Sequence, residues 1–364
     1  MGHRTFSEDD YRTARRDYGV TSSTDVTRKA EQRARDTGRL SEIVDPAVEP
    51  VRRSLIRLDP YQKQWMATVG CPVDIEVSCD TTGSMGGEVD TEMAVLPDLY
   101  KAVSKVLPGH DPQLCLGIFG DVSDKFVMCR PQFEMEAAKI VNYLKEMAPQ
   151  RDGGDAPEDP QYAMFARAYL TDAYTNRIGL KGYHFVVTDA TCHKRISREE
   201  IKRIFGAEIF NNELENMSQI PTIERMIEEL KKKTHQFILV VKGYEDTYDF
   251  WRQLCGEGSV ITLNSTRQLP AVISAIIGLT EGTLDVGNLG DHLGNNLNLV
   301  RQLSGIDIGA QAKLRHALPH PVPQKGDIFA KKGDIWPISA SKSDADAATE
   351  TKTDESAEDE IRYL

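Results

Sequence analysis

The amino-acid sequence predicts an α/β fold: a doubly wound, mostly parallel six-stranded sheet with one antiparallel strand at its edge. Short apolar segments that end in glycine or polar residues alternate with amphipathic segments of about 10–15 residues. This alternation is typical of a parallel sheet covered by helices on both faces. Residues 120–124 form a link that is too short for a crossover connection. The strand after this link, 125–129, should therefore run antiparallel at the sheet edge.

Each expected strand is a short run rich in apolar and β-branched side chains. The strands are expected at 73–79, 113–119, 125–129, 183–188, 237–241 and 259–263, and the helices at 88–106, 133–147, 161–176, 222–233, 248–255, 268–278 and, shorter, 293–303. Pro97 removes one backbone donor from the first helix and should kink it. In open sheets of this type, binding sites lie beyond the carboxyl ends of the parallel strands.

Changes in composition divide the chain into five parts. Residues 71–282 hold the expected sheet domain, 1–50 form a polar arm that is flexible or loosely docked, and 51–70 supply apolar side chains that pack on the domain. Residues 283–338 form a C-terminal extension, and 339–364 form an acidic tail that is expected to be disordered.

The composition of the 364-residue chain excludes several classes of protein. Its net charge of -12 disfavours nucleic-acid binding, which requires clustered Lys and Arg. The chain has no apolar run of about 18 residues to span a membrane, and its N-terminus lacks the apolar core of a secretion signal. We therefore expect a cytoplasmic protein. Its six cysteines form no C-x-x-C pair and are expected to be reduced core residues.

The motif Asp80-Thr-Thr-Gly-Ser84 directly follows the first expected strand. Asp80, Thr82 and Ser84 present three hard oxygen atoms at alternate positions, and the neighbouring glycines allow a turn tight enough for these oxygens to converge. One carboxylate and two hydroxyl groups suit Mg²⁺, Mn²⁺ or Ca²⁺, whereas zinc prefers nitrogen and sulfur. Taken alone, so short a motif more often caps the following helix.

Two later segments favour the metal site over the helix cap. An acidic, glycine-rich loop contains Asp155, and a second buried strand ends just before Asp189. Because Asp80 and Asp189 both stand at the carboxyl ends of strands, folding can bring them together at one edge of the sheet.

Together these motifs resemble the von Willebrand factor A (VWA) domain and its metal-ion-dependent adhesion site (MIDAS), roughly over residues 70–282. In that family a D-x-S-x-S motif, a distant threonine and a T-D strand end share one divalent cation. The resemblance implies the Rossmann-like strand order 3-2-1-4-5-6. It also implies Asp80, Thr82, Ser84 and Asp189 as ligands of a cation, most simply Mg²⁺. Asp155 stands where the threonine is expected, as in the G-G-D-x-P-E branch associated with atypical (alpha) kinases.

The resemblance implies a protein-protein interaction module that makes and breaks no bond and is not an enzyme. An acidic residue of a partner protein would replace a water molecule on the cation. Three aspartates leave a charge of about -1 around a dication, so an acidic partner should bind more weakly than with a threonine at position 155. An AAA+ ATPase or a kinase, in a multi-protein assembly, is the kind of partner implied.

Other polar residues near these motifs have ordinary roles available. Asp121 and Asp124 are candidates for a position near the cation without binding it, but turn chemistry alone explains both and is favoured. Glu158 is a third such candidate, and both Glu158 and Asp159 are expected to begin the following helix, where carboxylates suit the helix dipole. His184 and His193 have no partner at zinc-ligand spacing, so core or surface roles are expected for both.

The same motif allows an enzymatic alternative. Asp-Thr-Thr-Gly-Ser is similar to the D-x-T-G-T of haloacid-dehalogenase-like enzymes, and this implies a Mg²⁺-dependent phosphotransferase or phosphatase with Asp80 as nucleophile. Such an enzyme would need a lysine and an acidic pair late in the chain. Residues 120–124 come too early for that pair, and Asp291 lies outside the expected sheet.

Overall fold

The computed structural model describes residues 23–53, 57–58, 65–66, 72–151, 157–177 and 179–310. Its main sheet has six strands in the order β10-β9-β8-β4-β5-β6. The strands are β4 (Pro72–Asp80), β5 (Asp111–Phe119), β6 (Met128–Cys129), β8 (Gly182–Thr188), β9 (Thr234–Val241) and β10 (Val260–Leu263). All neighbours are parallel except β5 and β6, which are antiparallel. Counted along the chain from β6, this is the expected order 3-2-1-4-5-6, so the predicted fold class is confirmed.

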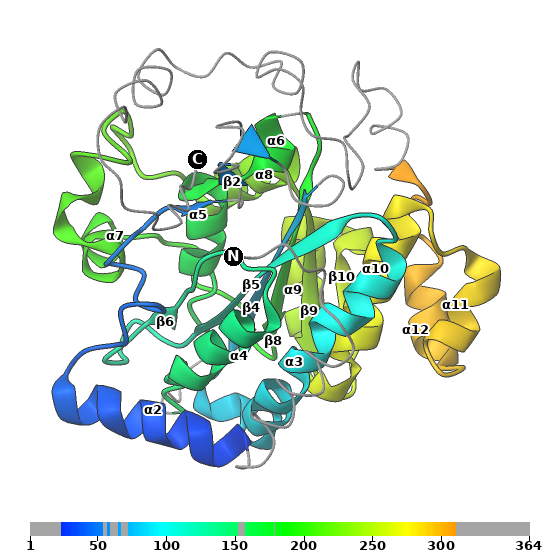
Figure 1. Ribbon diagram of the computed structural model, residues 1–364, viewed down its shortest axis with the longest axis horizontal. Coiled ribbons are helices and arrows are strands. Elements are labelled where there is room, and N and C mark those ends of the chain that lie inside the picture. The colour runs from blue at the N-terminus through cyan, green and yellow to red at the C-terminus, as the bar shows by residue number, and fades with distance from the viewer. Residues whose placement is uncertain are drawn as a thin grey trace.

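Helices cover both faces of the sheet (Figure 1). One face carries α3 (Gly87–Val106), α4 (Ala137–Glu146) and α10 (Leu269–Glu281); the other carries α5 (Gln161–Tyr169), α7 (Arg198–Phe205), α8 (Ile223–Lys233) and α9 (Glu245–Cys255). A separate hydrophobic cluster fills the space under each layer. In Figure 1, α3 and α10 lie side by side in front of the strands. The sheet is therefore buried on both faces, as expected for parallel strands.

The two faces of β4 differ in chemistry. Successive side chains of a strand point to opposite faces, and one face of β4 places Val73, Ile75, Val77 and Cys79 in the hydrophobic cluster with α3. The other face presents Asp74, Glu76, Ser78 and Asp80, which we call the polar row, and all four are buried. In a sheet with one solvent-exposed face, alternating apolar and polar residues would place the polar ones in water. Here both faces are buried, so the polar side chains of β4 need hydrogen-bonding or charged partners inside the protein.

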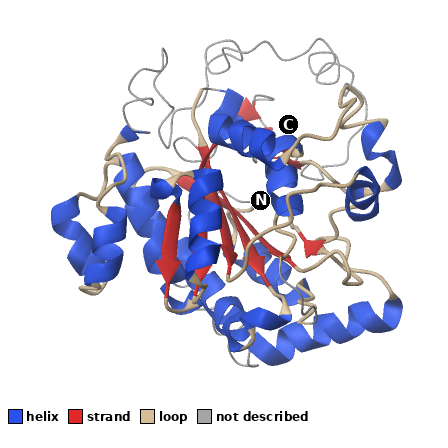
Figure 2. Cartoon of the chain, turned by 180° about the vertical axis from the view of Figure 1, so that it is seen from behind, coloured by secondary structure: helices blue, strands red, loops and turns tan. Residues whose placement is uncertain are grey.

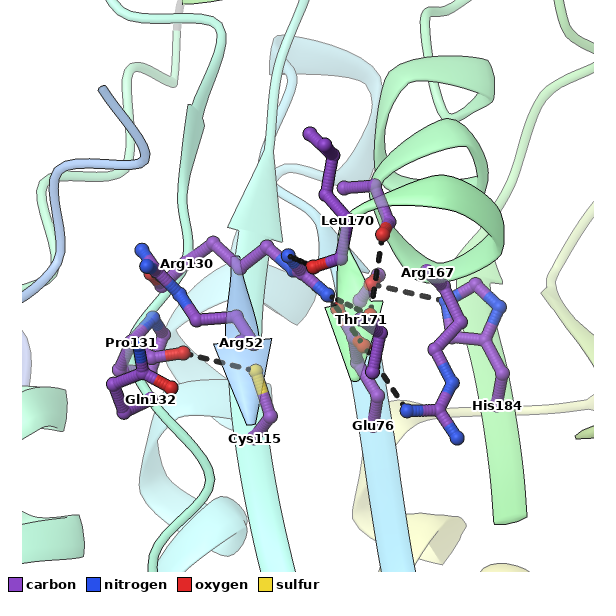
Figure 3. A network of polar contacts seen from close by, with 12 residues as sticks. Arg52, Glu76, Cys115, Arg130, Pro131, Gln132, Arg167, Leu170, Thr171 and His184 are labelled. Carbon is purple, nitrogen blue, oxygen red and sulfur yellow. Dashed lines mark hydrogen bonds and ion pairs between the residues drawn. The ribbon is translucent and has the colours of Figure 1, made fainter. Parts of the chain in front are cut away.

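Arginine supplies the partner for Glu76 (Figure 3). The buried guanidinium of Arg130 donates to both carboxylate oxygens of Glu76, at 2.7 and 3.0 Å. The same guanidinium donates to the Leu170 carbonyl oxygen at 3.2 Å and to the Thr171 hydroxyl at 2.7 Å. Burial alone would raise the pKa of Glu76, but the charge and hydrogen bonds of Arg130 outweigh it and lower that pKa to about 2.

The next members of the polar row also have partners. Asp74 forms an ion pair with Arg167 of α5 and accepts a hydrogen bond from Thr175. The Ser78 hydroxyl lies 3.3 Å from Nε2 of His184, which is itself fully buried. Of the two ordinary roles expected for His184, surface or core, the structure shows the core role.

The expectation of one helix over 161–176 was wrong. The structure has α5, then the two-residue strand β7 (Thr171–Asp172), then α6 (Tyr174–Arg177). β7 pairs in parallel with β1 (Arg52–Arg53), and the backbone N–H of Arg52 donates to the Leu170 carbonyl. The carbonyl oxygen of Leu170 thus accepts hydrogen bonds from Arg52 and Arg130, which are far away in sequence, at the point where the predicted helix would have continued.

Two smaller differences concern single elements. The antiparallel direction of the edge strand is confirmed, but only β6 pairs with β5 out of the expected 125–129. Pro97 lies inside helix α3 as expected, and the kink there stays a prediction. A helix that the sequence did not indicate, α11 (Val286–His292), precedes α12 (Leu297–Leu303).

The described helices outside the sheet domain pack on it. Helix α2 (Ser23–Thr37) contacts α3 and α4, and Ala30, Ala34 and Val44 are buried. Helices α11 and α12 contact α10. A short antiparallel pair, β2 (Arg57–Leu58) and β3 (Trp65–Met66), completes the strands. Residues 1–22 and 311–364, which include the predicted tail, lie outside the described residues.

The single 3₁₀ turns are Gly83–Met85, Ala207–Phe210, Glu257–Ser259 and Thr266–Gln268. The five described cysteines are free and buried, as expected for reduced core residues. None of the described helices combines the length and apolarity that crossing a membrane requires.

Candidate metal centre

Two neighbouring parallel strands bring the central motif and the distant aspartate together. β4 ends at Asp80 and β8 ends at Thr188, directly before Asp189. The arrows of the parallel strands point to the same edge of the sheet (Figure 2). After Asp80 the chain forms the 3₁₀ turn Gly83–Met85 and then Gly86, whose φ of 51° is a conformation that favours glycine. This turn directs the motif's oxygens back over the strand ends.

The side-chain oxygens form a continuous chain of contacts. The Thr82 hydroxyl donates to Asp80 Oδ1 at 2.6 Å and lies 3.2 Å from Ser84 Oγ. Ser84 Oγ in turn donates to Asp189 Oδ1 at 2.8 Å. Thr188, which the sequence analysis did not select, donates to Asp80 Oδ2 at 2.7 Å. The structure thus brings Asp80, Thr82, Ser84 and Asp189 together, as expected.

These spacings fit the shell of one hard cation. In an octahedral Mg²⁺ site the oxygens lie at 2.0–2.1 Å from the ion, so neighbouring oxygens are about 3 Å apart. The successive contacts between Asp80, Thr82, Ser84 and Asp189 span 2.6 to 3.2 Å. The donor set contains oxygen only, which suits Mg²⁺, Mn²⁺ or Ca²⁺.

Asp80 differs from the other carboxylates of the polar row in having no positively charged partner among the described residues. Asp74 and Glu76 are each paired with an arginine, whereas none of the described lysines or arginines forms an ion pair with Asp80. Asp80 is fully buried, and this burial raises its pKa to about 6 despite the hydrogen bonds from Thr82 and Thr188. Burial likewise raises the pKa of Asp189. A cation at this point would supply the missing positive charge.

Glu158 adds a further carboxylate to this edge. Its backbone N–H donates to the Thr191 carbonyl, and its own carbonyl accepts from the N–H of His193, so it is anchored beside the loop that follows Asp189. The side chain is 2% exposed, and within the described residues its Oε2 has no hydrogen-bond partner. Burial, with added repulsion from the charge of Asp80, raises the pKa of Glu158 to about 8.

Glu158→Gln should remove part of the pH dependence of stability in the metal-free protein. Because the folded-state pKa of Glu158 is raised, the folded protein holds a proton that the unfolded chain loses, and stability falls as pH rises toward about 8. Between about pH 6.5 and 8.5 the wild type should lose roughly 1–2 kcal/mol more than the variant. Urea unfolding in chelator at both pH values measures this difference, and identical losses would contradict it.

Asp121 and Asp124 have the turn roles that the sequence favoured for them. Asp124 Oδ2 accepts from the N–H of Asp121, and Asp121 Oδ1 accepts from the N–H of Ser123. Asp121 also approaches Asp159 and His193, so that one ligand atom from each of the three lies within 4.8 Å of the others. From the sequence, Asp159 was expected to begin a helix and His193 to have an ordinary surface or core role. Spacing along the chain gave no signal for this group, because its members come from three separate loops.

Asp155 lies outside the described residues, so its predicted role as a ligand stays a prediction. The described residue closest before this segment is Arg151, whose backbone N–H donates to the Thr81 carbonyl in the central motif. On the other side the chain resumes at residue 157, next to Glu158.

Comparison with known proteins gave distant structural similarity only. No family model and no curated protein matched the sequence. Proximal thread matrix protein 1 of the mussel byssus, with a zinc-occupied MIDAS motif, is 12% identical over 58% of this chain and 46% of its own, with a TM-score of 0.37. The pilus adhesin SpaC of Lactobacillus rhamnosus GG is 13% identical over 64% of this chain and 31% of its own, with a TM-score of 0.40.

A third structure, BatB of Bacteroides thetaiotaomicron, is 10% identical over 56% of this chain and 95% of its own, with a TM-score of 0.36. This chain therefore spans less than half the length of the mussel and pilus proteins. At such low similarity, the fold class stands on the strand order and register of this chain.

Proposed function

We propose that the protein is a metal-dependent protein-interaction module of the VWA type, which binds one divalent cation, Mg²⁺ in the first instance, at the carboxyl edge of its sheet. Asp80, Thr82, Ser84 and Asp189 would hold the ion. When bound, the ion offers an open coordination position that a carboxylate of a partner protein can occupy. Asp155 is proposed as an additional ligand, directly or through water, on the basis of the sequence.

The observation that carries the proposal is the charge imbalance within the polar row. Two of its three carboxylates, Asp74 and Glu76, are neutralised by arginines within ion-pair distance. The third, Asp80, is equally buried but is surrounded by hydroxyl groups and by Asp189. A buried carboxylate needs a compensating charge. A hard cation supplies that charge, and oxygen atoms at these spacings are the ligands that it binds.

Partner binding should depend on the cation. The tagged full chain should capture partner proteins from an extract in Mg²⁺ and release them in chelator, because the ion bridges the two proteins. The tagged Asp189→Ala variant should fail to capture the same partner proteins even in Mg²⁺. Asp249→Ala is the matched control, since Asp249 is an exposed aspartate on α9. Capture that is unchanged by chelator and by Asp189→Ala would refute the proposal.

The geometry gives no support to the phosphotransferase alternative. Asp80 has no exposed surface, and both of its carboxylate oxygens accept hydrogen bonds, whereas a nucleophile must reach its substrate. Asp291, the late acidic residue considered with this alternative, stands in α11 outside the sheet.

A further inference from the structure

We propose a second metal site in this protein, formed by Asp121, Asp159 and His193, which takes a borderline transition-metal ion such as Zn²⁺. It would lie beside the oxygen-only centre at the same edge of the sheet. The proposal goes beyond the proposed function and does not depend on it.

The three side chains converge from separate segments. Asp121 lies in the turn after β5, Asp159 lies just before α5, and His193 lies in the loop after β8. One carboxylate oxygen from each aspartate and one ring nitrogen of the histidine lie within 4.8 Å of one another. Ligand atoms at about 2.0–2.2 Å from one zinc ion are separated by about 3–4 Å. A small rotation of the exposed His193 side chain would close the remaining gap.

The backbone around these ligands is fixed by hydrogen bonds that do not involve a metal. The N–H of Val122 donates to Asp159 Oδ2 at 2.8 Å, which ties the turn of Asp121 to Asp159. The N–H of His193 donates to the Glu158 carbonyl at 3.1 Å, which ties the histidine to the same segment. Asp121 and Asp159 are 5% and 2% exposed, so the two carboxylates are held in a buried position with the imidazole on the solvent side.

Glu158 provides an independent sign that positive charge belongs here. Its side chain is 2% exposed, and its Oε2 lacks a hydrogen-bond partner in the described part of the chain. The charges of Asp80 and Asp121 both act on it, so it lies close to both groups of ligands. Glu158 is therefore a single carboxylate, with one unsatisfied oxygen, that neighbours both groups of ligands.

The count of charges also exceeds what one cation neutralises. Five carboxylates meet at this edge, and within the described residues none of them forms an ion pair with lysine or arginine: Asp80, Asp121, Glu158, Asp159 and Asp189. At neutral pH Glu158 holds its proton, so the other four carboxylates leave a charge of about -2 around one dication and about 0 around two. A second ion would therefore neutralise the remaining buried charge.

The ligand types separate the two sites by chemistry. The first centre offers oxygen atoms only, which Mg²⁺ accepts. The second offers an imidazole nitrogen with two carboxylates. This ligand set suits zinc and related transition metals, and it should bind Mg²⁺ only weakly because Mg²⁺ prefers oxygen ligands. Zn²⁺ titrated into the protein in saturating Mg²⁺ should therefore report the second site alone.

The test is calorimetric titration of the chelator-treated full chain with Zn²⁺ in excess Mg²⁺. Wild type should bind one Zn²⁺ per chain, and His193→Gln should weaken that binding at least about tenfold. Asp121→Asn should weaken it similarly. The matched control is His110→Gln, because His110 precedes β5 at the opposite edge of the sheet; this variant should bind Zn²⁺ like wild type. Because His193 is exposed, its replacement should leave the thermal midpoint of the metal-free protein unchanged.

Equal Zn²⁺ affinity in wild type and His193→Gln, or no saturable Zn²⁺ binding, would overturn the second site. Zn²⁺ binding that is lost in Asp80→Ala but kept in His193→Gln would place zinc in the first centre, which overturns this inference and leaves the proposed function standing. Zn²⁺ binding that depends on His193, in a protein whose Mg²⁺ affinity does not depend on Asp80, would support the second site and refute the first.

Discussion

Replacing Asp80 with alanine should reduce the affinity for Mg²⁺ by more than about 100-fold. Loss of a residue that only orients a metal ligand already costs about 10–100-fold, and Asp80 contacts both the Thr82 hydroxyl and the Thr188 hydroxyl at the centre of the site. Without its carboxylate, the remaining oxygens hold one negative charge fewer near the ion. Titration calorimetry with Mg²⁺ measures the change.

The same variant should fold without penalty in the absence of metal. Asp80 is buried with no arginine or lysine partner among the described residues, and its pKa is raised to about 6 by that burial. At neutral pH, ionising it in the folded protein therefore costs free energy, up to roughly 3 kcal/mol. Asp80→Ala should thus keep the thermal midpoint of the metal-free wild type. The exposed Asp249→Ala serves as the control with unchanged Mg²⁺ affinity, and unchanged affinity in Asp80→Ala would refute the assignment.

Replacing Arg130 with alanine should destabilise the protein by about 3–5 kcal/mol, the cost of leaving a buried charge without its partner. Arg130 makes two hydrogen bonds to Glu76 and two more to Leu170 and Thr171, and both charged side chains are fully buried. The loss should appear as a lower urea midpoint at neutral pH.

Two further variants separate the buried pair from ordinary surface charge. Combining Arg130→Met with Glu76→Leu should recover most of the lost stability, because neither charge is then left unpaired. Lys232→Ala should change stability by less than about 1 kcal/mol, since Lys232 is 71% exposed and its ion pair with Glu229 is solvated. A stable Arg130→Ala variant would contradict the prediction and would show that Arg167, whose Nη1 lies 3.9 Å from Glu76 Oε2, is enough to compensate this carboxylate.

The sequence predicted the oxygen-only centre because its determinants are local. Asp80, Thr82 and Ser84 follow one another in a single turn, and Asp189 follows directly after a strongly apolar strand. Parallel strands present their carboxyl ends at one edge, so locating the two strands was enough to place these residues together. The antiparallel edge strand followed from the length of one connection, whereas the order of the strands was expected from the resemblance to the VWA domain.

Other parts of the site depend on contacts that no local pattern contains. Thr188 joins the centre because the last side chain of β8 faces Asp80 across the strand pair. His193 and Asp159 approach Asp121 because a short bridge between Glu158 and Cys192 aligns their loops. Their separation in sequence follows no regular spacing.

By itself the sequence determined the class of fold, the antiparallel edge strand and the motif at the end of the first strand, since hydrophobic periodicity and connection length act over a few residues. Only the tertiary structure decided which buried carboxylates of β4 are neutralised by arginine and which one is not. That difference depends on where Arg130 and Arg167 come to lie relative to β4. Their positions are fixed by packing between elements that are far apart along the chain, and the buried charge they leave uncompensated gathers at the carboxyl edge of the sheet.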